Sequence, residues 1–522
     1  MNNFKNVRLK KSLSENLENI RRITGKTSDL LENPITVNGV NFNLICFEGM
    51  IATSTITELV LHPIMDIENR TDSTDPNELM DFVKNRTLMT IDRGFSEDYG
   101  DLLRRAMSGF AILLIDGVDE AAAFGVQGYA VRGIGEPNGE GNVKGSHEGF
   151  VETVRTNMSL VRRRIKSPLL RFELFPISEC SNTDVIVCYM ADRVPQSTVK
   201  GIKKQLKNIR LETILGSGYI EPFLDRSPLS LFSGVSVTER PDSFCGKLLE
   251  GRIGVMIEGT PYAIIIPYLF IENFQTMDDY NMRPYYATFI RLIKFAAFLL
   301  AVFLPGVYVA AATFHPEMFR FDLLKKLAET ELDAPLPLAA EALIVLIFYE
   351  IVREAGLRLP KNIGGAVSIV GGLIIGDAAV SGGLISNPML VAAALSVTAG
   401  FVVPNLSQPV TLLRFLTVIA GGLWGFFGVS VIGAVTLVNI CSIESCGIPV
   451  TAPLSPFTPK SMRDVFTRLG FKYLEKGNVT VGGLNGALSN PEGQSIRTLV
   501  PGKAEGILCG GLYKLRYLHG GF

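Results

Sequence analysis

Hydrophobic positions are distributed unevenly along the 522-residue chain. Up to about residue 280, short apolar runs alternate with polar ones, as they do in water-soluble proteins. β-Branched or aromatic runs bounded by Gly, Asp or Pro predict strands, and amphipathic runs at 15–25 and 198–215 predict helices. The predicted strands lie at 41–51, 109–117, 183–192, 251–259 and 260–270. The pattern predicts an α/β N-terminal region with two subdomains, at residues 1–160 and 161–282.

The following part, residues 283–445, is predicted to be an α-helical multispanning transmembrane domain, because charged residues are sparse there. A helix needs about 20 mostly apolar residues to cross the hydrocarbon core of a bilayer. Pro305 is expected to kink the first of these segments. The last segment is either one strongly tilted helix or two segments broken near Gly421–Gly422. The apolar stretches run over 287–314, 338–354, 363–385, 389–403 and 410–440.

Basic residues predict which side of the membrane each connection faces, since they concentrate on the cytoplasmic side. Arg291 and Lys294 lie near the start of the first span, where we expect them to reach the headgroups. Basic residues also occupy the loop at 353–361 and the polar tail, 446–522, whereas acidic residues dominate the loop at 315–337. We therefore expect a cytoplasmic N-terminal region, a cytoplasmic tail and an even number of crossings. The first residues contain no apolar core, so no cleaved signal peptide is expected.

Ionisable residues inside the apolar stretches are the candidate functional residues, because a charge at that depth normally faces protein or water. Glu350, Arg353 and Glu354 fall close together on one helix and either line an aqueous path or form an ion pair at its cytoplasmic end. Asp377 has no basic neighbour in its own segment, which favours a polar cavity or pore. Glu341, near the start of the second span, completes the set.

Small residues also form a pattern in the third apolar stretch. They recur at steps of three, four and seven, which places them on one helical stripe. In lipid, such a stripe allows a neighbouring helix to approach closely. That neighbour belongs either to the same chain or to another subunit. The members of the stripe are Gly365, Gly372, Gly376, Ala379 and Gly383.

Residue patterns typical of catalysis are missing from the sequence. The four histidines have no HExxH spacing, and no GxSxG elbow is present. Gly25-Lys26-Thr27 lacks the first glycine of a P-loop, because Ile20 stands in its place. We expect no enzymatic activity, metal or cofactor, and the net charge of −1 gives no reason to expect nucleic-acid binding. The basic run at 162–164 is interpreted as a solvated or salt-bridged helix face, with contact to anionic headgroups as the alternative.

Several longer phrases resemble the A subunits of the GerA-type spore germinant receptors, and the resemblance covers about residues 12–470. The related sporulation-stage-V AF proteins share these phrases and amplify ion release. The resemblance implies residence in the spore inner membrane and partnership with a nutrient-binding, multispanning B subunit and a lipoprotein C subunit. It also implies a homo-oligomeric ring that forms a nutrient-gated channel and releases cations to start germination. The phrases stand at 145–173, 218–242, 248–267, 273–284, 357–388 and 452–459.

Two other classes of protein remain as alternatives. A secondary transporter would show internal repeats and paired broken helices. No repeat is visible, although the break near Gly421–Gly422 fits such a protein. A membrane enzyme would need a convergent set of catalytic groups, and none is found. The Gly-rich tail after about residue 475 has no counterpart in the family and is interpreted as a flexible extension.

Overall fold

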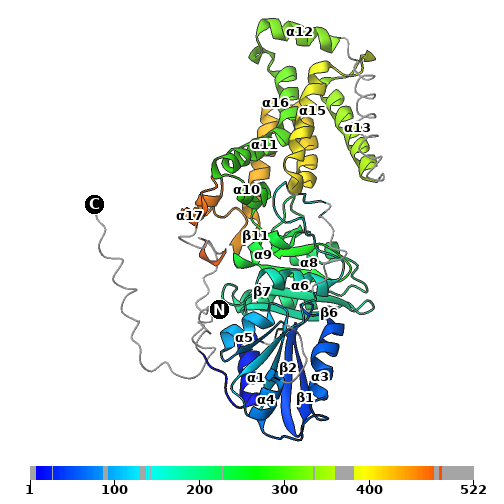
Figure 1. Ribbon diagram of the computed structural model, residues 1–522. Helices are drawn as coiled ribbons and strands as arrows, with labels where there is room; N and C mark the ends of the chain where they lie inside the picture. Colours follow the sequence, from blue (N-terminus) through cyan, green and yellow to red (C-terminus); the bar gives the residue numbers. More distant parts are fainter. Residues whose placement is uncertain are drawn as a thin grey trace, which may run out of the picture.

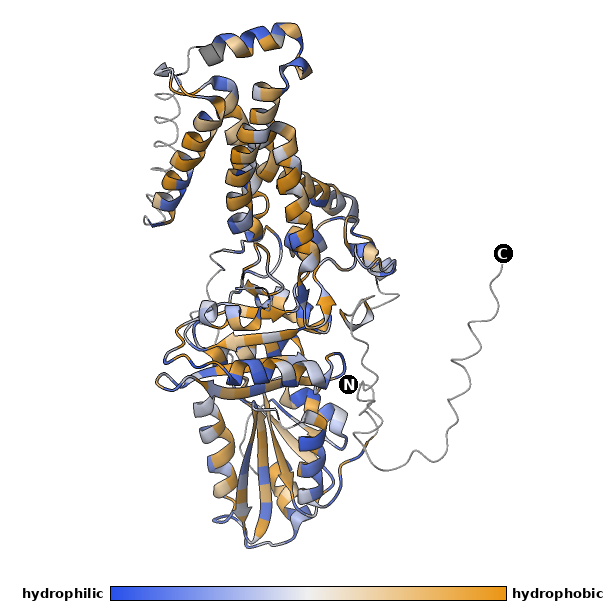
Figure 2. Ribbon diagram, turned by 180° about the vertical axis from the view of Figure 1, so that it is seen from behind, coloured by the Kyte–Doolittle hydropathy of each residue, from blue (hydrophilic) through white to orange (hydrophobic). Residues whose placement is uncertain are grey.

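A computed structural model describes residues 7–25, 27–85, 92–128, 137, 139–141, 143–225, 227, 229–332, 335–358, 381–474 and 481–484. Figure 1 shows two layers of strands and helices at one end of the molecule and a bundle of long helices at the other. In Figure 2 the long helices are mostly apolar in colour, whereas the helices beside the first sheet carry polar surfaces. The contrast follows the change in charge density along the sequence.

The first sheet has five antiparallel strands in the order β1-β2-β4-β5-β3. Apolar residues of β4 alternate between its two faces, as the period of two in a strand requires. One face packs against α1 and α5, and the other against α2, η1, α3 and α4. The bounds are α1 (Leu13–Thr24), β1 (Leu30–Val37), β2 (Val40–Phe47), α2 (Thr53–Ile56), η1 (Thr57–Leu61), α3 (His62–Met65), α4 (Pro76–Asn85), β3 (Arg93–Ser96), α5 (Tyr99–Ala106), β4 (Phe110–Ile115) and β5 (Ala121–Gly125).

The second sheet repeats this plan, with five antiparallel strands in the order β6-β7-β9-β10-β8. One face packs against α6 and α9, and the other against α7 and α8. Because α6 belongs to this core, the boundary between the two units lies ahead of Val154 and not at residue 160. The bounds are α6 (Val154–Arg164), β6 (Leu170–Ile177), β7 (Thr183–Met190), α7 (Gln196–Lys207), η2 (Ser217–Tyr219), α8 (Glu221–Leu224), β8 (Ser236–Thr238), α9 (Pro241–Leu249), β9 (Ile253–Ile257) and β10 (Ala263–Ile266).

A buried ion pair joins the two units. Arg162 of α6 binds Asp29, which precedes β1, and both side chains are 1% exposed, with 2.8 Å between the charged atoms. The guanidinium also stacks on the rings of Phe47 and Phe172 and donates to the carbonyl oxygen of Leu170. Its charge and hydrogen-bonding groups are thus satisfied by residues from both units.

The helical part begins with α11, which continues from α10 on the second unit. Two helical stretches, Pro284–Phe314 and Pro404–Ser442, are long and apolar enough to cross a membrane by length and composition. The second and fourth predicted segments correspond to α13 and α15, and most of the third lies outside the described residues. The bounds are η3 (Phe270–Phe274), α10 (Asp278–Asn281), α11 (Pro284–Phe314), η4 (Pro316–Met318), α12 (Phe321–Leu332), α13 (Leu338–Arg358), α15 (Asn387–Phe401), η5 (Pro404–Leu406) and α16 (Ser407–Ser442).

The last long helix, α16, is a hairpin that reverses at Gly425. This residue has φ 59° and ψ −144°, which are not helical values. Gly428 comes back against the first half, since a Cβ there would lie 2.2 Å from the carbonyl oxygen of Ala420. Val410 and Ile440, near the two ends, share one apolar cluster beside the second unit. Of the two alternatives left open by the sequence, the structure thus shows two segments, and the break comes after Gly421–Gly422, at Gly425.

The predicted break residues serve packing instead. A Cβ on Gly421 would lie 2.5 Å from the carbonyl oxygen of Gly306 in α11, and one on Gly422 would lie 2.5 Å from the Cβ of Ala339 in α13. The two glycines thus let α16 approach both neighbours. Short elements follow the hairpin and return to the second unit: β11 (Glu444–Ser445), β12 (Ile448–Pro449), η6 (Ser461–Asp464), α17 (Phe471–Leu474) and η7 (Val481–Gly483).

The ion pair between the two units generates the first prediction. Asp29→Ala leaves the guanidinium of Arg162 buried without its carboxylate, which costs about 3–5 kcal/mol. Amide hydrogen exchange in α1 and α6 of the full chain should therefore accelerate by about a hundredfold or more, at 1.4 kcal/mol per tenfold. Glu32→Ala, at the more exposed pair with Arg21, should cost about 0–1 kcal/mol. Equal exchange in the two variants would contradict the prediction.

Candidate functional site

Part of the predicted site lies outside the described residues. This applies to Asp377 and to the small residues Gly365, Gly372, Gly376 and Ala379. Gly383 is described, and it lies in the turn before α15 with φ 64°, a left-handed backbone that glycine adopts readily. This last member of the stripe is therefore a turn residue and not part of a helix face.

Glu341 has a structural role in the bundle. Its side chain is 1% exposed, and it accepts hydrogen bonds of 2.9 Å from both the backbone N–H and the hydroxyl of Ser386. Ser386 is the N-cap of α15, where a carboxylate is stabilised by the helix dipole. Glu341 thus ties the start of α13 to the start of α15.

The acidic and basic residues at the other end of α13 form two separate pairs. Glu350 binds Arg353 at 2.6 Å and accepts a 3.4 Å hydrogen bond from Thr411 of α16, so it faces the bundle. Glu354 binds Arg358 at 2.6 Å, and the side chains of both residues are more than half exposed. The sequence placed Glu350, Arg353 and Glu354 in one group. The structure divides this group and adds Arg358.

Arg414 is a buried residue of the bundle that is not among the candidate residues predicted from the sequence. Its side chain, from α16, is 3% exposed. It donates to the carbonyl oxygens of Ala301 in α11, at 3.0 Å, and of Ser396 in α15, at 3.2 Å. One guanidinium therefore holds three helices together. The sequence did contain a signal for such a residue, because Arg414 is a basic residue four positions after the start of a long apolar segment.

Where the second unit meets the bundle, Arg291 and Lys294 of α11 bind carboxylates and do not reach toward headgroups. Arg291 is 0% exposed and binds Asp279 of α10 and Asp464 of η6, both at 2.8 Å. Lys294 reaches Asp279 at 3.3 Å and the hydroxyl of Thr276 at 3.0 Å. The expected snorkelling is wrong because Asp279 of the preceding helix and Asp464 of a distant segment meet these side chains inside the protein.

Tyr280 lies at the centre of this junction. The guanidinium groups of Arg291 and Arg468 lie 5.6 and 5.8 Å from its ring centroid, and its hydroxyl donates to Asp464 at 2.7 Å. Burial, with the nearby carboxylate of Asp464, raises the pKa of Tyr280 well above its usual value. The phenol therefore stays protonated and keeps donating. The junction consequently joins α10, α11 and the segment after the bundle into one unit.

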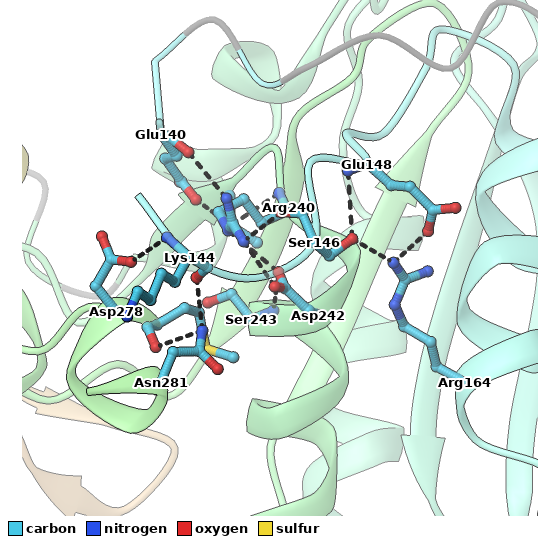
Figure 3. Close-up of polar contacts among 12 residues, drawn as sticks. Glu140, Lys144, Ser146, Glu148, Arg164, Arg240, Asp242, Ser243, Asp278 and Asn281 are labelled. Carbon is cyan, nitrogen blue, oxygen red and sulfur yellow. Dashed lines mark hydrogen bonds and ion pairs between the residues drawn. The ribbon is translucent and has the colours of Figure 1, made fainter. Parts of the chain in front are cut away.

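A strap, defined as residues 139–141 and 143–148, crosses the second unit beside this junction (Figure 3). Arg240, at the start of α9, donates to the backbone carbonyls of Glu140 and Ser146 at 3.1 and 3.0 Å and is itself held by Asp242 at 2.6 Å. The carboxyl of Glu140 accepts from Thr238 at 2.7 Å. Burial raises the pKa of Glu140, and the neighbouring hydroxyl of Thr238 and charge of Arg240 oppose this rise.

The other contacts of the strap reach α10 and α6. Asp278 of α10 accepts from the backbone N–H groups of Val143 and Lys144, at 3.2 and 3.0 Å, and Asn281 donates to the carbonyl of Lys144 at 2.7 Å (Figure 3). Glu148 binds two residues of the basic run in α6, Arg163 and Arg164. The predicted salt-bridged interpretation of this run is thus confirmed. The strap links the second unit to the short helix that leads into α11.

A cavity of about 350 Å³ lies between the strap, α9, α10 and the turn before α16. Its ionisable lining consists of three acids and three bases, so its formal charge is balanced: Glu140, Glu250, Glu272, Arg240, Lys247 and Lys294. A neighbouring cavity of about 390 Å³ shares Glu250, Glu272, Gln275 and Tyr280 with it. Across the described ranges, no group of three or more His, Cys, Asp or Glu is placed to hold a metal ion.

Comparison with known proteins gives consistent results over most of the chain. The family model described as Bacillus/Clostridium GerA spore germination protein matches residues 18–479. Spore germination protein KA of Bacillus subtilis (strain 168) is 34% identical, over 89% of this chain and 85% of that protein. The uncharacterized membrane protein YfkQ of the same organism is 33% identical, over 88% and 89%. The crystal structure of the N-terminal domain of the A subunit of the Bacillus megaterium spore germinant receptor GerK3 matches at 32% identity, 50% and 97% coverage and a TM-score of 0.40.

The buried carboxyl of Glu140 generates a prediction about pH. Because its pKa is raised while the strap makes the contacts described above, protonation stabilises those contacts. This stabilisation is complete below the ordinary pKa of glutamate and is lost as the pH rises through the raised value. Amide exchange of the strap, corrected for the intrinsic effect of pH, should therefore accelerate as the pH rises above the ordinary titration range of a glutamate side chain. Glu140→Gln should remove this acceleration. If the variant keeps it, another group is responsible.

Proposed function

The chain belongs to the Bacillus/Clostridium GerA spore germination protein family, and on that premise we propose that it is the A subunit of a spore germinant receptor. The family match over residues 18–479 is the observation that carries this proposal. The relatives' names support it, because they include several spore germination proteins at 28–34% identity. The proposed partners are a nutrient-binding B subunit and a lipoprotein C subunit in the spore inner membrane.

The proposed membrane domain consists of α11, α13, α15, the two halves of α16 and the apolar stretch at 363–385. The 31 residues of α11 extend about 46 Å, and each half of α16 extends about 25 Å, at 1.5 Å per residue. Tyr285 and Tyr286, exposed at the start of α11, are typical of a membrane interface. Because α16 reverses at Gly425, the chain after it returns to the side of the α/β region. This supports an even number of crossings with both ends cytoplasmic.

Topology can be tested with single cysteines in a background without native cysteines. Lys460→Cys should react only with a reagent that has access to the cytoplasmic side, and Glu329→Cys only with one on the other side. The reason is that basic residues favour the cytoplasmic face and that α11 separates the two positions. The measurement is labelling in intact cells and in lysed membranes. Labelling of both positions from one side would contradict the proposed crossings.

We propose further that the bundle, in a homo-oligomeric ring, forms a nutrient-gated cation channel. Polar groups inside an apolar bundle support this, because a conduction path needs charges that face water at depth. The candidate residues along the conduction path are Asp377 and, at the cytoplasmic end of α13, Glu350.

A secondary transporter is the second candidate function. It is favoured because α11 contains Pro305 and α16 breaks at Gly425, and broken helices occur at transporter binding sites. Stoichiometric counter-transport would favour the transporter.

The channel proposal is tested by measuring cation release or conductance per molecule, with membrane abundance measured in parallel. Asp377→Asn should lower cation flux about tenfold without loss of protein, and Asp377→Lys should block it, because selectivity follows the sign of charges along the path. Glu350→Gln should have a smaller effect, since Arg353 already offsets its charge. Glu354→Gln, at the more exposed pair, is the matched control and should leave flux unchanged. Unaltered flux and cation preference in Asp377→Asn would place the path elsewhere.

A further inference from the structure

Pro305 interrupts the hydrogen bonding of α11 from inside the helix. In an α-helix the N–H of each residue donates to the carbonyl four positions earlier, and proline has no N–H. The carbonyl oxygen of Ala301 therefore has no donor from its own helix. In an apolar bundle no water replaces the missing donor, so another part of the protein must supply it.

Two side chains from different helices supply that donor. The carbonyl oxygen of Ala301 accepts from the hydroxyl of Ser396 in α15, at 2.8 Å, and from Nε of Arg414 in α16, at 3.0 Å. Arg414 also donates through Nη2 to the carbonyl of Ser396, at 3.2 Å. Both acceptor positions of the Ala301 oxygen are thus filled, and one guanidinium connects the interrupted turn of α11 to α15.

The backbones of α11 and α16 approach each other at the same level. A Cβ on Gly306 would lie 2.5 Å from the carbonyl oxygen of Thr417, so no larger residue fits without movement. The hydroxyl of Thr417 donates to the carbonyl of Val302 at 2.8 Å. The carbonyl of Val302 is in a different position from that of Ala301. The residue four positions after Val302 is Gly306, which has an N–H that can donate to it, whereas the residue four positions after Ala301 is Pro305, which has none.

The partners of Arg414 are unusual for a buried charge. Both of its hydrogen bonds go to backbone carbonyls. Glu350 of α13 forms its ion pair with Arg353. The charge of Arg414 is therefore held by the carbonyl dipoles, and its position depends on the interruption at Pro305.

We propose that Pro305 and Gly306 form a hinge in α11 and that Arg414 is the positioning residue that holds this hinge in the conformation seen here. Release of Arg414 from the Ala301 carbonyl leaves α11 free to bend, which moves its two halves relative to α15 and α16. The functional part of this inference rests on the proposed ion path, in which bending of α11 changes cation release. The structural part is independent of conduction.

The experiment compares four variants with the unaltered full chain. Arg414→Met removes both bonds, so amide exchange around residues 301–309 should accelerate at least tenfold, and cation release without nutrient should rise severalfold. Pro305→Ala gives position 305 an N–H that donates to the Ala301 carbonyl. Exchange there should slow at least tenfold, and nutrient-dependent release should fall about tenfold.

The double variant Pro305→Ala/Arg414→Met separates positioning from general stability. If Arg414 acts through the carbonyl that Pro305 frees, the double variant should behave like Pro305→Ala alone in both measurements. Additive effects of the two changes would overturn the proposal, because they would show that the residues act independently. Thr417→Val is the matched control. It removes a cross-helix bond at the same level but leaves Val302 with its helical donor, so exchange should change less than twofold.

Two further outcomes are decisive. If Arg414→Met does not accumulate in the membrane, normal accumulation of the double variant supports the coupling, and its loss overturns it. Exchange can follow the predicted order while neither the unaltered protein nor any variant releases cations. That result would support the hinge and contradict the proposed channel function. Unchanged exchange in Arg414→Met overturns the hinge whatever the flux shows.

Discussion

The ion pair between Arg291 and Asp279 joins the α/β region to the helical bundle, and the placement of the segments on both sides depends on it. Arg291 belongs to α11, Asp279 to α10, and Asp464 brings in the segment that follows the bundle. A buried guanidinium is costly to leave without its partners, because desolvation has removed its alternative in water. The three segments therefore hold one another in position, because moving any one of them would separate a buried charge from a partner.

Arg162 and Arg414 are also buried, at two other levels of the molecule, and the chemistry of their partners changes with the surroundings. Arg162 joins the two sheets through a carboxylate and two aromatic rings, whereas Arg414 in the bundle binds backbone carbonyls. A planar guanidinium donates in several directions at once, which a lysine ammonium on a flexible stem does less precisely. One residue type can thus connect three segments where a carboxylate is present and also where the acceptors are backbone carbonyls.

The sequence predicts those features of the fold that follow from local patterns. The strands β2, β4, β7, β9 and β10 and the helices α1 and α7 appear where periodicity placed them, because alternation and helical spacing are properties of neighbouring residues. The pairing of Arg162 with Asp29 and of Arg291 with Asp464 spans more than a hundred residues, and no local pattern specifies it. The reversal of α16 shows the same limit. Several glycines in this stretch could break the helix, and only packing against α11 and α13 separates Gly425 from Gly421 and Gly422.

The contacts around α10 indicate which way a movement would travel through the molecule. The strap binds α10 through backbone groups and through Asp278 and Asn281, at exposed positions, where water can replace a lost hydrogen bond at little cost. The pair of Asp279 with Arg291 has no such replacement, because it is buried. A change in the cavity or the strap therefore separates the strap from α10 more readily than it separates α10 from α11. The start of α11 then follows α10 as one body, and the nearest place where the helix can bend is Pro305, where its own hydrogen bonding is already interrupted.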